Sequence, residues 1–221
     1  MKLLDKEKQI KILFEDNHLI IAEKPSPFLT QPTEKENNSL ETYLKSYIKE
    51  KENKQNNVYL HCIHRIDKKV SGIVIFAKSS KALKRMQKMQ KEKEIEKKYI
   101  AKLSGKLSTL ESILENYLKH SNFKALITNK NEKDSKLASL SYRVIKYTDG
   151  NSIVEITLNT GRYHQIRAQF SHIGHPIVGD RKYGSLQDFE SIMLHHALVS
   201  FIHPVTLKQI TVSSPADFVG V

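Results

Sequence analysis

The chain contains little sulfur and no long apolar run, and both features limit what it can be. Its 221 residues include a single cysteine, Cys62, so neither an internal disulfide nor a cysteine-based zinc site can form. No apolar stretch approaches the ~20 residues that a membrane-spanning helix needs. The segment from Met1 to Lys8 is charged and lacks the apolar core of a secretory signal. We therefore expect a soluble, cytoplasmic protein.

Acidic residues are scarce relative to basic ones. The chain has 36 Lys and Arg against 24 Asp and Glu, which gives a net charge of +12. Such an excess suggests a polyanionic partner, either nucleic acid or an anionic membrane surface. A generally lysine-rich proteome would give the same composition, so charge alone does not decide between these interpretations.

One stretch places a base and an acid two residues apart before an apolar run. It reads His64-Arg65-Ile66-Asp67, and Ser71-Gly72 and a run of β-branched and aromatic residues to Ala77 follow. The run predicts a buried strand, so we expect Asp67 on a loop held against a sheet, where reactive side chains are common. From these residues alone, an ordinary exposed ion pair between Arg65 and Asp67 is an equal alternative.

Apolar residues at helical spacing predict three helices. The first follows Asn38, which we take as its N-cap. The second is capped by Ser79 or Ser80 and runs to about Lys93. Its outer face is dense in Lys and Arg, which indicates either a solvated face or a surface for a nucleic-acid backbone. The third runs from about Arg162 to His172.

Short apolar or alternating runs predict the strands. They fall at residues 10–14 and 19–22, which read as a hairpin or two sequential strands, and at 99–103, 140–147, 153–158, 194–201 and 209–212. The segment from Leu107 to about Ile127 is the least informative, and we expect a partly helical insertion there. The role of residues 107–135 stays open.

The stretch around Asp67 resembles the active-site motif of the RluA-like family of RNA pseudouridine synthases. The family pattern is HRLD, a few polar residues, SG and an apolar strand ending in AK; here it stands as HRID-KKV-SG-IVIF-AK. Three further segments match the family in order and spacing. They are Lys97 to Gly105, Thr160 to Gly184, and Leu194 to Pro204. The resemblance covers nearly the whole chain, from about Leu13 to Phe218.

The resemblance implies that uridine is converted to pseudouridine in RNA. This reaction breaks an N-glycosidic bond, rotates the base and rejoins it through carbon 5, so no cofactor and no metal are expected. A carboxylate must act either as nucleophile at the anomeric carbon or as base at the 2′ position, and the motif assigns this role to Asp67. Arg167, or less favourably Arg162, is the guanidinium expected to keep Asp67 ionised.

Other matched residues are expected to hold the RNA. Tyr99 matches the family's aromatic residue that stacks on the uracil ring, and it is the third expected catalytic residue. Arg65 resembles the residue that enters the RNA stack when the target base flips out. Ile166 is expected to pack beneath Tyr99. The full set of expected RNA-contacting residues is Arg65, His64, Arg162, Lys98 and Ile166.

Departures from the family pattern bear on the substrate more than on the reaction. Lys68-Lys69-Val70 stands where Arg-Asp-Thr is usual, and Tyr163 replaces a small hydroxyl residue. The ten histidines include close pairs, but none has the spacing of a metal site. A catalytically silent RNA-binding protein or ribosome-assembly factor on the same fold is the alternative, and a metal-dependent nuclease lacks the carboxylate cluster it would need.

We therefore expect one α/β (α+β) catalytic domain over residues 1–221, without a separate N-terminal RNA-binding domain. Its sheet should be mixed and largely antiparallel, with flanking helices and two lobes around an RNA-binding cleft. The expected partner is a structured ribosomal or transfer RNA, bound by a monomer through its basic surface. The sequence does not identify the RNA or the uridine that is modified.

Overall fold

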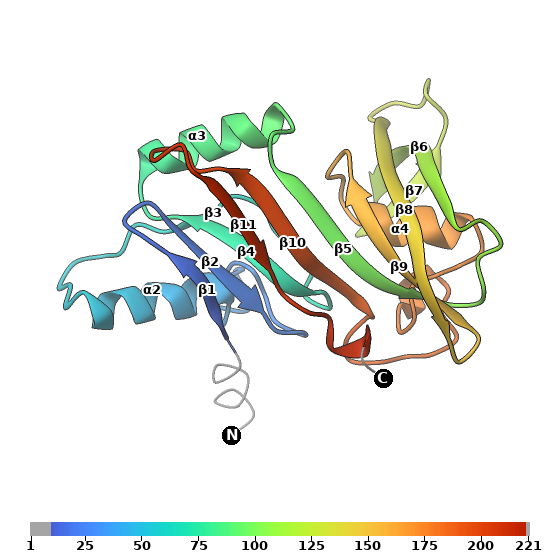
Figure 1. The fold of residues 1–221 in the computed structure, drawn as a ribbon, viewed down its shortest axis with the longest axis horizontal. Coiled ribbons are helices and arrows are strands. Elements are labelled where there is room, and N and C mark those ends of the chain that lie inside the picture. The colour runs from blue at the N-terminus through green and yellow to red at the C-terminus, as the bar shows by residue number, and fades with distance from the viewer. Residues whose placement is uncertain (1–9, 220–221) are drawn as a thin grey trace. The chain divides into compact units, whose positions relative to one another are not determined.

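Strands and helices of the computed structural model fall into two units, and the structure describes residues 10–219 (Figure 1). Unit 1 comprises residues 10–95 and 198–214, and unit 2 comprises residues 96–197 and 215–219. The predicted fold class is confirmed, because both units are built on antiparallel strand pairs with few helices. That the two units form a single catalytic domain stays a prediction. The segment from Met1 to Lys8 lies outside the described residues.

No helix within residues 10–219 is both long and apolar enough to cross a membrane.

The strands of unit 1 surround β4 (Ser71–Ala77). Strand β2 (Leu19–Lys24) lies antiparallel to β4 and to β1 (Ile12–Glu15), which confirms the predicted hairpin. The two-residue strand β3 (His61–Cys62) also pairs with β4. The last pair is β10 (Leu194–Ile202) with β11 (Gln209–Ser213), in which β10 contributes its residues from Leu198 onward.

Both faces of the central strand are covered, as its apolar sequence predicts. Every residue of β4 from Gly72 to Ala77 is buried, and neighbouring side chains of a strand point to opposite faces. Helix α3 (Ser80–Lys91) covers one face with Ala82 and Met86. Helix α2 (Leu40–Lys51) completely buries three apolar side chains of its own, namely Leu40, Leu44 and Ile48.

The N-cap of α2 is one residue later than predicted. Ser39, rather than Asn38, has the extended backbone of a cap, and its hydroxyl accepts a hydrogen bond from the Thr42 backbone N–H at 3.2 Å. Ser79 caps α3 in the same way, accepting from the Ala82 N–H at 3.2 Å. Both caps satisfy a backbone donor that the first turn of a helix leaves without a partner.

Unit 2 is an antiparallel series of five strands. Their order is β5 (Glu96–Leu103), β9 (Asn151–Leu158), β8 (Lys136–Thr148), β6 (Glu111–Ser121) and β7 (Lys124–Thr128). The expectation of a partly helical insertion from Leu107 to Ile127 is wrong, because β6 and β7 form a hairpin there. Its turn residues, Asn122 and Phe123, have φ of 43° and 59°. A phenylalanine is unusual in this left-handed conformation, so the turn lacked its common sequence signal.

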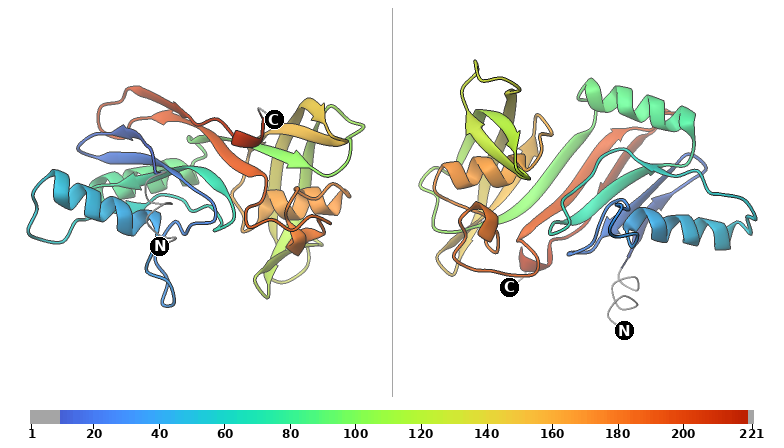
Figure 2. Two further views of the ribbon diagram at one scale, coloured as in Figure 1. Left: turned by 90° about the horizontal axis from the view of Figure 1, so that it is seen from below. Right: turned by 180° about the vertical axis from the view of Figure 1, so that it is seen from behind.

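Helix α4 (Gln165–His172) begins three residues later than predicted and packs on the β6–β7 side of unit 2 (Figure 2). The Gln165 side chain explains the delay. Its Oε1 accepts from the Thr160 hydroxyl at 2.8 Å and the Arg162 backbone N–H at 3.0 Å, so it holds residues 160–162 outside the helix. Two short 3₁₀ helices, η1 (Arg181–Tyr183) and η2 (Asp217–Val219), complete the described chain.

Candidate active site

The loop that carries Asp67 joins β3 to β4 in unit 1 and is fixed on both sides of the aspartate. Ile66 and Val70 are buried, and the Thr30 hydroxyl both donates to the Ile66 carbonyl at 3.0 Å and accepts from its N–H at 3.3 Å. The Val70 N–H donates to the Asp67 carbonyl at 3.0 Å, which closes a turn. This anchoring leaves Asp67 half-buried and Arg65 exposed.

His64 supports the same loop from the side of β4. Its Nε2 accepts a hydrogen bond from the Ile75 backbone N–H at 3.4 Å. An accepting ring nitrogen carries no proton, so in neutral His64 the proton lies on Nδ1. The contact gives His64 a role in holding the loop, in addition to the RNA contact expected from the sequence.

A buried lysine lies beneath the Asp67 loop, and the sequence did not single it out. Lys24 ends β2 and is 0% exposed. Its ammonium group donates to the carbonyls of Pro25 at 2.9 Å, Phe28 at 2.6 Å and Lys68 at 3.2 Å. The Phe28 N–H donates to the same Lys68 carbonyl at 2.9 Å. Lys24 therefore ties the residue after Asp67 to the loop that follows β2.

Burial also weakens the charge on this lysine. Desolvation lowers the pKa of Lys24 from its ordinary value of 10.5 to about 7, while the nearby carboxylate of Asp67 raises it and Lys68 lowers it further. A charged amine out of water is costly unless its protons are satisfied, which the three carbonyls do. In its charged form, Lys24 places a positive charge near the Asp67 side chain.

Arg167 of unit 2 is held by a carboxylate that the sequence did not identify. Its Nε–H and one Nη2–H donate to the two oxygens of Asp180 at 2.6 and 2.8 Å. Both side chains are buried, with 7% of Arg167 and 2% of Asp180 exposed. A two-point contact of this kind fixes the plane of the guanidinium, which a lysine could not do.

A glycine turn sets the position of Asp180. Gly179 has φ of 86°, and a Cβ at this position would lie 2.9 Å from the Ser191 carbonyl oxygen. A side chain would therefore be strained and would collide with backbone, so only glycine fits. The chain then turns into η1, where the Asp180 carbonyl accepts from the Tyr183 N–H at 3.0 Å.

A second contact of Arg167 leads to the β6–β7 hairpin. One Nη1–H lies 2.9 Å from His164 Nε2, and His164 Nδ1 lies 3.0 Å from the Tyr183 hydroxyl. Because arginine only donates, Nε2 is the acceptor, and Nδ1–H donates to Tyr183. The Tyr183 hydroxyl also accepts from the Ala125 N–H of β7 at 2.7 Å. These bonds join α4, η1 and the hairpin in one network.

Tyr99 is buried on β5 with its ring stacked on His196. The two ring centres are 4.4 Å apart and the rings are 13° from parallel. Tyr99 is 7% exposed. The stack fixes the plane of the tyrosine, which is the property that a platform for a base needs.

The structure separates Lys98 from Tyr99. Adjacent residues of a strand point to opposite faces, and Lys98 lies 3.7 Å from Glu155 and 3.8 Å from Glu96. Lys97 has the same face as Tyr99, and burial lowers the pKa of its ammonium group to about 8. The expected RNA contact of Lys98 stays a prediction, and strand alternation could have identified Lys97 as the lysine beside Tyr99.

Arg162 and Ile166 complete the unit 2 set. Arg162 is exposed, and its Nε–H donates to the Leu137 carbonyl of β8 at 2.9 Å. Ile166 is 5% exposed on α4, consistent with the packing role expected for it. The expected residues His64, Arg65 and Asp67 belong to unit 1, and the other five belong to unit 2. Joint action of the two sets stays a prediction.

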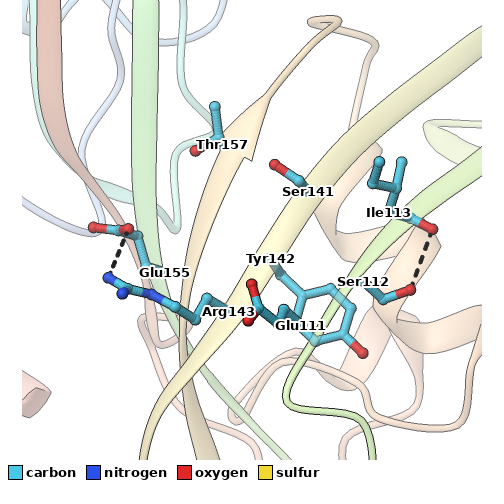
Figure 3. A pocket seen from close by; sticks show the side chains of 8 residues that line it. All are labelled: Glu111, Ser112, Ile113, Ser141, Tyr142, Arg143, Glu155 and Thr157. Atoms are coloured by element: carbon cyan, nitrogen blue, oxygen red, sulfur yellow. Dashed lines mark hydrogen bonds and ion pairs between the residues drawn. The ribbon is translucent and has the colours of Figure 1, made fainter.

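An open pocket of about 520 Å³ on β6, β8 and β9 contains none of these residues (Figure 3). Its lining includes Glu111, Arg143 and Glu155, and Arg143 lies 3.4 Å from Glu155. A lining with two carboxylates and one guanidinium does not favour the binding of a polyanion. This pocket is therefore a poor candidate for an RNA site.

Within residues 10–219, no group of three or more His, Cys, Asp and Glu side chains could hold a metal ion. The absence of a metal requirement stays a prediction.

Residues 18–172 match the family described as RNA pseudouridylate synthase. Over 93% of the chain and 67% of the relative, the sequence is 33% identical to ribosomal large subunit pseudouridine synthase C of Buchnera aphidicola subsp. Schizaphis graminum. It is 28% identical to the dual-specificity RNA pseudouridine synthase RluA of Escherichia coli K12, over 96% of the chain and 95% of the relative.

The fold is also that of solved structures. The structure titled human RNA pseudouridylate synthase domain containing 1 matches with a TM-score of 0.78 and 20% identity, over 95% of this chain and 84% of that one. Human RNA pseudouridylate synthase domain containing 4 matches with a TM-score of 0.78 and 18% identity, over 97% of this chain and 91% of that one. The chain belongs to the RNA pseudouridylate synthase family, a class of isomerases that act on RNA.

Replacing Lys24 should change how stability depends on pH. Between pH 7 and about 10 the unfolded chain keeps the Lys24 proton and the folded chain loses it, so wild-type stability rises with pH through this window. Between pH 7 and pH 10, the free energy of unfolding of the wild type should rise by a few kcal/mol more than that of Lys24→Met. Each unit of pKa shift corresponds to about 1.4 kcal/mol. Urea unfolding at pH 7 and pH 10 measures this difference.

The control is Lys49→Met, which changes an exposed lysine of α2. Its stability should follow the wild type at both pH values. Parallel pH curves for wild type and Lys24→Met would contradict the buried, weakly charged state of Lys24.

Replacing Asp180 should destabilise the protein strongly. Asp180→Asn leaves the buried guanidinium of Arg167 without its carboxylate, and breaking a buried pair typically costs about 3–5 kcal/mol. Asp188→Asn is the matched control, because Asp188 pairs with Arg181 at 3.2 Å on the exposed surface. It should cost less than about 1 kcal/mol. If urea unfolding showed the same loss of stability in both variants, the buried pair would contribute no more than an exposed one.

Proposed function

We propose that the protein converts uridine to pseudouridine in a ribosomal or transfer RNA, with Asp67 as the essential carboxylate. The observation that carries the proposal is the Asp67 loop, fixed by Thr30 and Lys24, in a chain that belongs to this family. Relatives are named for ribosomal RNA, for transfer RNA and for dual specificity, which supports these two substrate classes. Both RNAs would be met in the cytoplasm.

The reaction balances without an oxidant or a nucleotide. The bond between uracil N1 and the anomeric carbon breaks, the base turns, and carbon 5 forms the new bond. Carbon 5 loses a proton and N1 takes one up. Asp67 acts either as the nucleophile at the anomeric carbon or as the base at the 2′ position. Its half-buried place on an anchored loop supports both roles, and the chain's own residues need no cofactor for either.

Arg167 is proposed as the guanidinium that keeps Asp67 ionised during the reaction. Desolvation of a carboxylate in a closed site would otherwise favour its neutral form. The support comes from the family motif and from the two-point contact with Asp180, which fixes the guanidinium before any substrate binds. Preorganised charge of this kind costs no reorganisation at the moment of reaction.

Tyr99 and Arg65 are proposed to handle the flipped base. Tyr99 would stack on the uracil ring, an interaction worth roughly 1–3 kcal/mol per base, and its stack on His196 holds the ring plane in advance. Lys97, on the same face of β5, would add positive charge beside it. Arg65 is exposed on the Asp67 loop and would fill the gap in the RNA stack, which offsets part of the cost of extrusion.

Asp67→Asn should abolish pseudouridine formation while RNA binding persists. We expect a loss of roughly a thousandfold or more in rate, since an amide is neither the nucleophile nor the base. The measurement is tritium release from RNA labelled at uracil carbon 5, using ribosomal and transfer RNA that lack pseudouridine. Asp134→Asn, which changes an exposed loop carboxylate of unit 2, is the control and should keep full activity.

Wild-type protein that binds these RNAs without releasing tritium would favour the silent RNA-binding factor instead. Activity retained by Asp67→Asn would remove the aspartate from the mechanism.

Chelation should leave the reaction unaffected. Neither a Lewis acid nor a metal-bound water is needed when a carboxylate acts as the nucleophile or as the base, so excess EDTA should not change the rate. The RNA is kept folded with monovalent salt and spermidine, so that removal of magnesium does not unfold the substrate. Loss of tritium release that a divalent metal restores would overturn the cofactor-free mechanism.

A further inference from the structure

Helix α3 carries a basic face without acidic residues. Its twelve residues include five cationic side chains and not one Asp or Glu. We call these five the α3 basic face, and all of them are exposed: Lys81, Lys84, Arg85, Lys88 and Lys91.

The five side chains form one stripe. At ~100° per residue they fall within an arc of about 120°, on the opposite side of the helix from Ala82 and Met86, which are buried in the core of unit 1. From Lys81 to Lys91 the stripe is about 15 Å long, at ~1.5 Å per residue. Figure 1 shows α3 as one continuous helix of unit 1.

Few neighbouring groups neutralise this stripe. Arg85 donates to the Pro204 carbonyl at 2.7 Å. Lys88 lies 3.9 Å from Glu92, and the side chains of Lys88 and Glu92 are both exposed. Among residues 10–219, no ion pair involves Lys81, Lys84 or Lys91. Five positive charges therefore face solvent almost uncompensated.

Helix α2 of the same unit differs in this respect. Its three lysines are accompanied by Glu41 and Glu50, and Lys45 pairs with Glu41 at 2.7 Å. Lys51 pairs with Glu15 of β1 at 2.7 Å. The lysines of α2 are thus largely compensated by carboxylates, whereas those of α3 are not.

We propose that the α3 basic face binds the phosphate backbone of the substrate RNA. The proposal rests on the proposed function, because the partner is the RNA that is modified. Lysine ammonium groups are compact point charges suited to phosphates, and such contacts position a nucleic acid without reading its sequence. The partner is inferred from charge. When a row of lysines neutralises the phosphates of an RNA, counterions are released from the RNA, and this release favours binding.

The location of the stripe sets how far the RNA must extend. Asp67 lies just before β4 begins and α3 begins just after β4 ends, so the seven residues of this strand separate them by about 20 Å. An RNA that reaches both must therefore be longer than the flipped nucleotide and its neighbours. A structured ribosomal or transfer RNA meets this requirement.

The test variant is the triple substitution Lys81→Gln, Lys84→Gln and Lys91→Gln. Glutamine keeps helix propensity, and these three lysines have no ion pair among the described residues. The matched control is Lys45→Gln, Lys49→Gln and Lys51→Gln on α2, which lowers the net charge by the same three units. Binding of unfractionated transfer RNA, and separately of large-subunit ribosomal RNA, is measured over a series of salt concentrations.

The α3 variant should bind about tenfold more weakly at low salt. Its plot of log affinity against log salt should be flatter than that of wild type by about 2, at ~0.7–0.9 per lost phosphate contact. The α2 control should keep the wild-type slope. Equal slopes for the α3 variant and wild type, or equal changes in both variants, would overturn the proposal while leaving the proposed function intact. Wild-type protein that binds neither RNA would overturn both.

Discussion

The buried ion pair between Arg167 and Asp180 is the constraint on which the position of the candidate guanidinium of unit 2 depends. A guanidinium removed from water must find a carboxylate, because an unpaired buried charge costs several kcal/mol. Two hydrogen bonds of 2.6 and 2.8 Å meet this need and fix the guanidinium plane. The remaining contact of Arg167 passes through His164 to Tyr183, so one constraint sets α4, η1 and the β6–β7 hairpin together.

Unit 1 also contains a buried cation whose hydrogen bonds are satisfied by the protein, and this cation is a lysine. Lys24 is fully buried and satisfies its ammonium protons with three backbone carbonyls, one of them from Lys68 directly after Asp67. In each unit, a buried cation forms hydrogen bonds that fix part of the candidate site. In both, the geometry is present without substrate, which is the condition for electrostatic preorganisation.

Local patterns in the sequence predicted the parts of the structure that local physics determines. The apolar run of β4, the amphipathic helix α3 and the fold class are confirmed. Features that depend on distant residues were missed, including the partners of Lys24 and the carboxylate of Asp180. The β6–β7 hairpin was missed because Phe123 occupies a left-handed turn position normally filled by glycine or asparagine. The family motif predicted the chemistry, while only the structure could show which side chains hold it in place.

Pseudouridine mapping of ribosomal and transfer RNA in the native cell is the most direct test of the role of Asp67. Cells carrying the wild-type chain are compared with cells carrying Asp67→Asn at equal protein levels. We expect the signal to disappear at one or a few uridines and to stay unchanged elsewhere, which would identify the reaction and its substrate together. If every pseudouridine persisted in the mutant cells, the assignment of Asp67 as the essential carboxylate of an RNA isomerase would be contradicted.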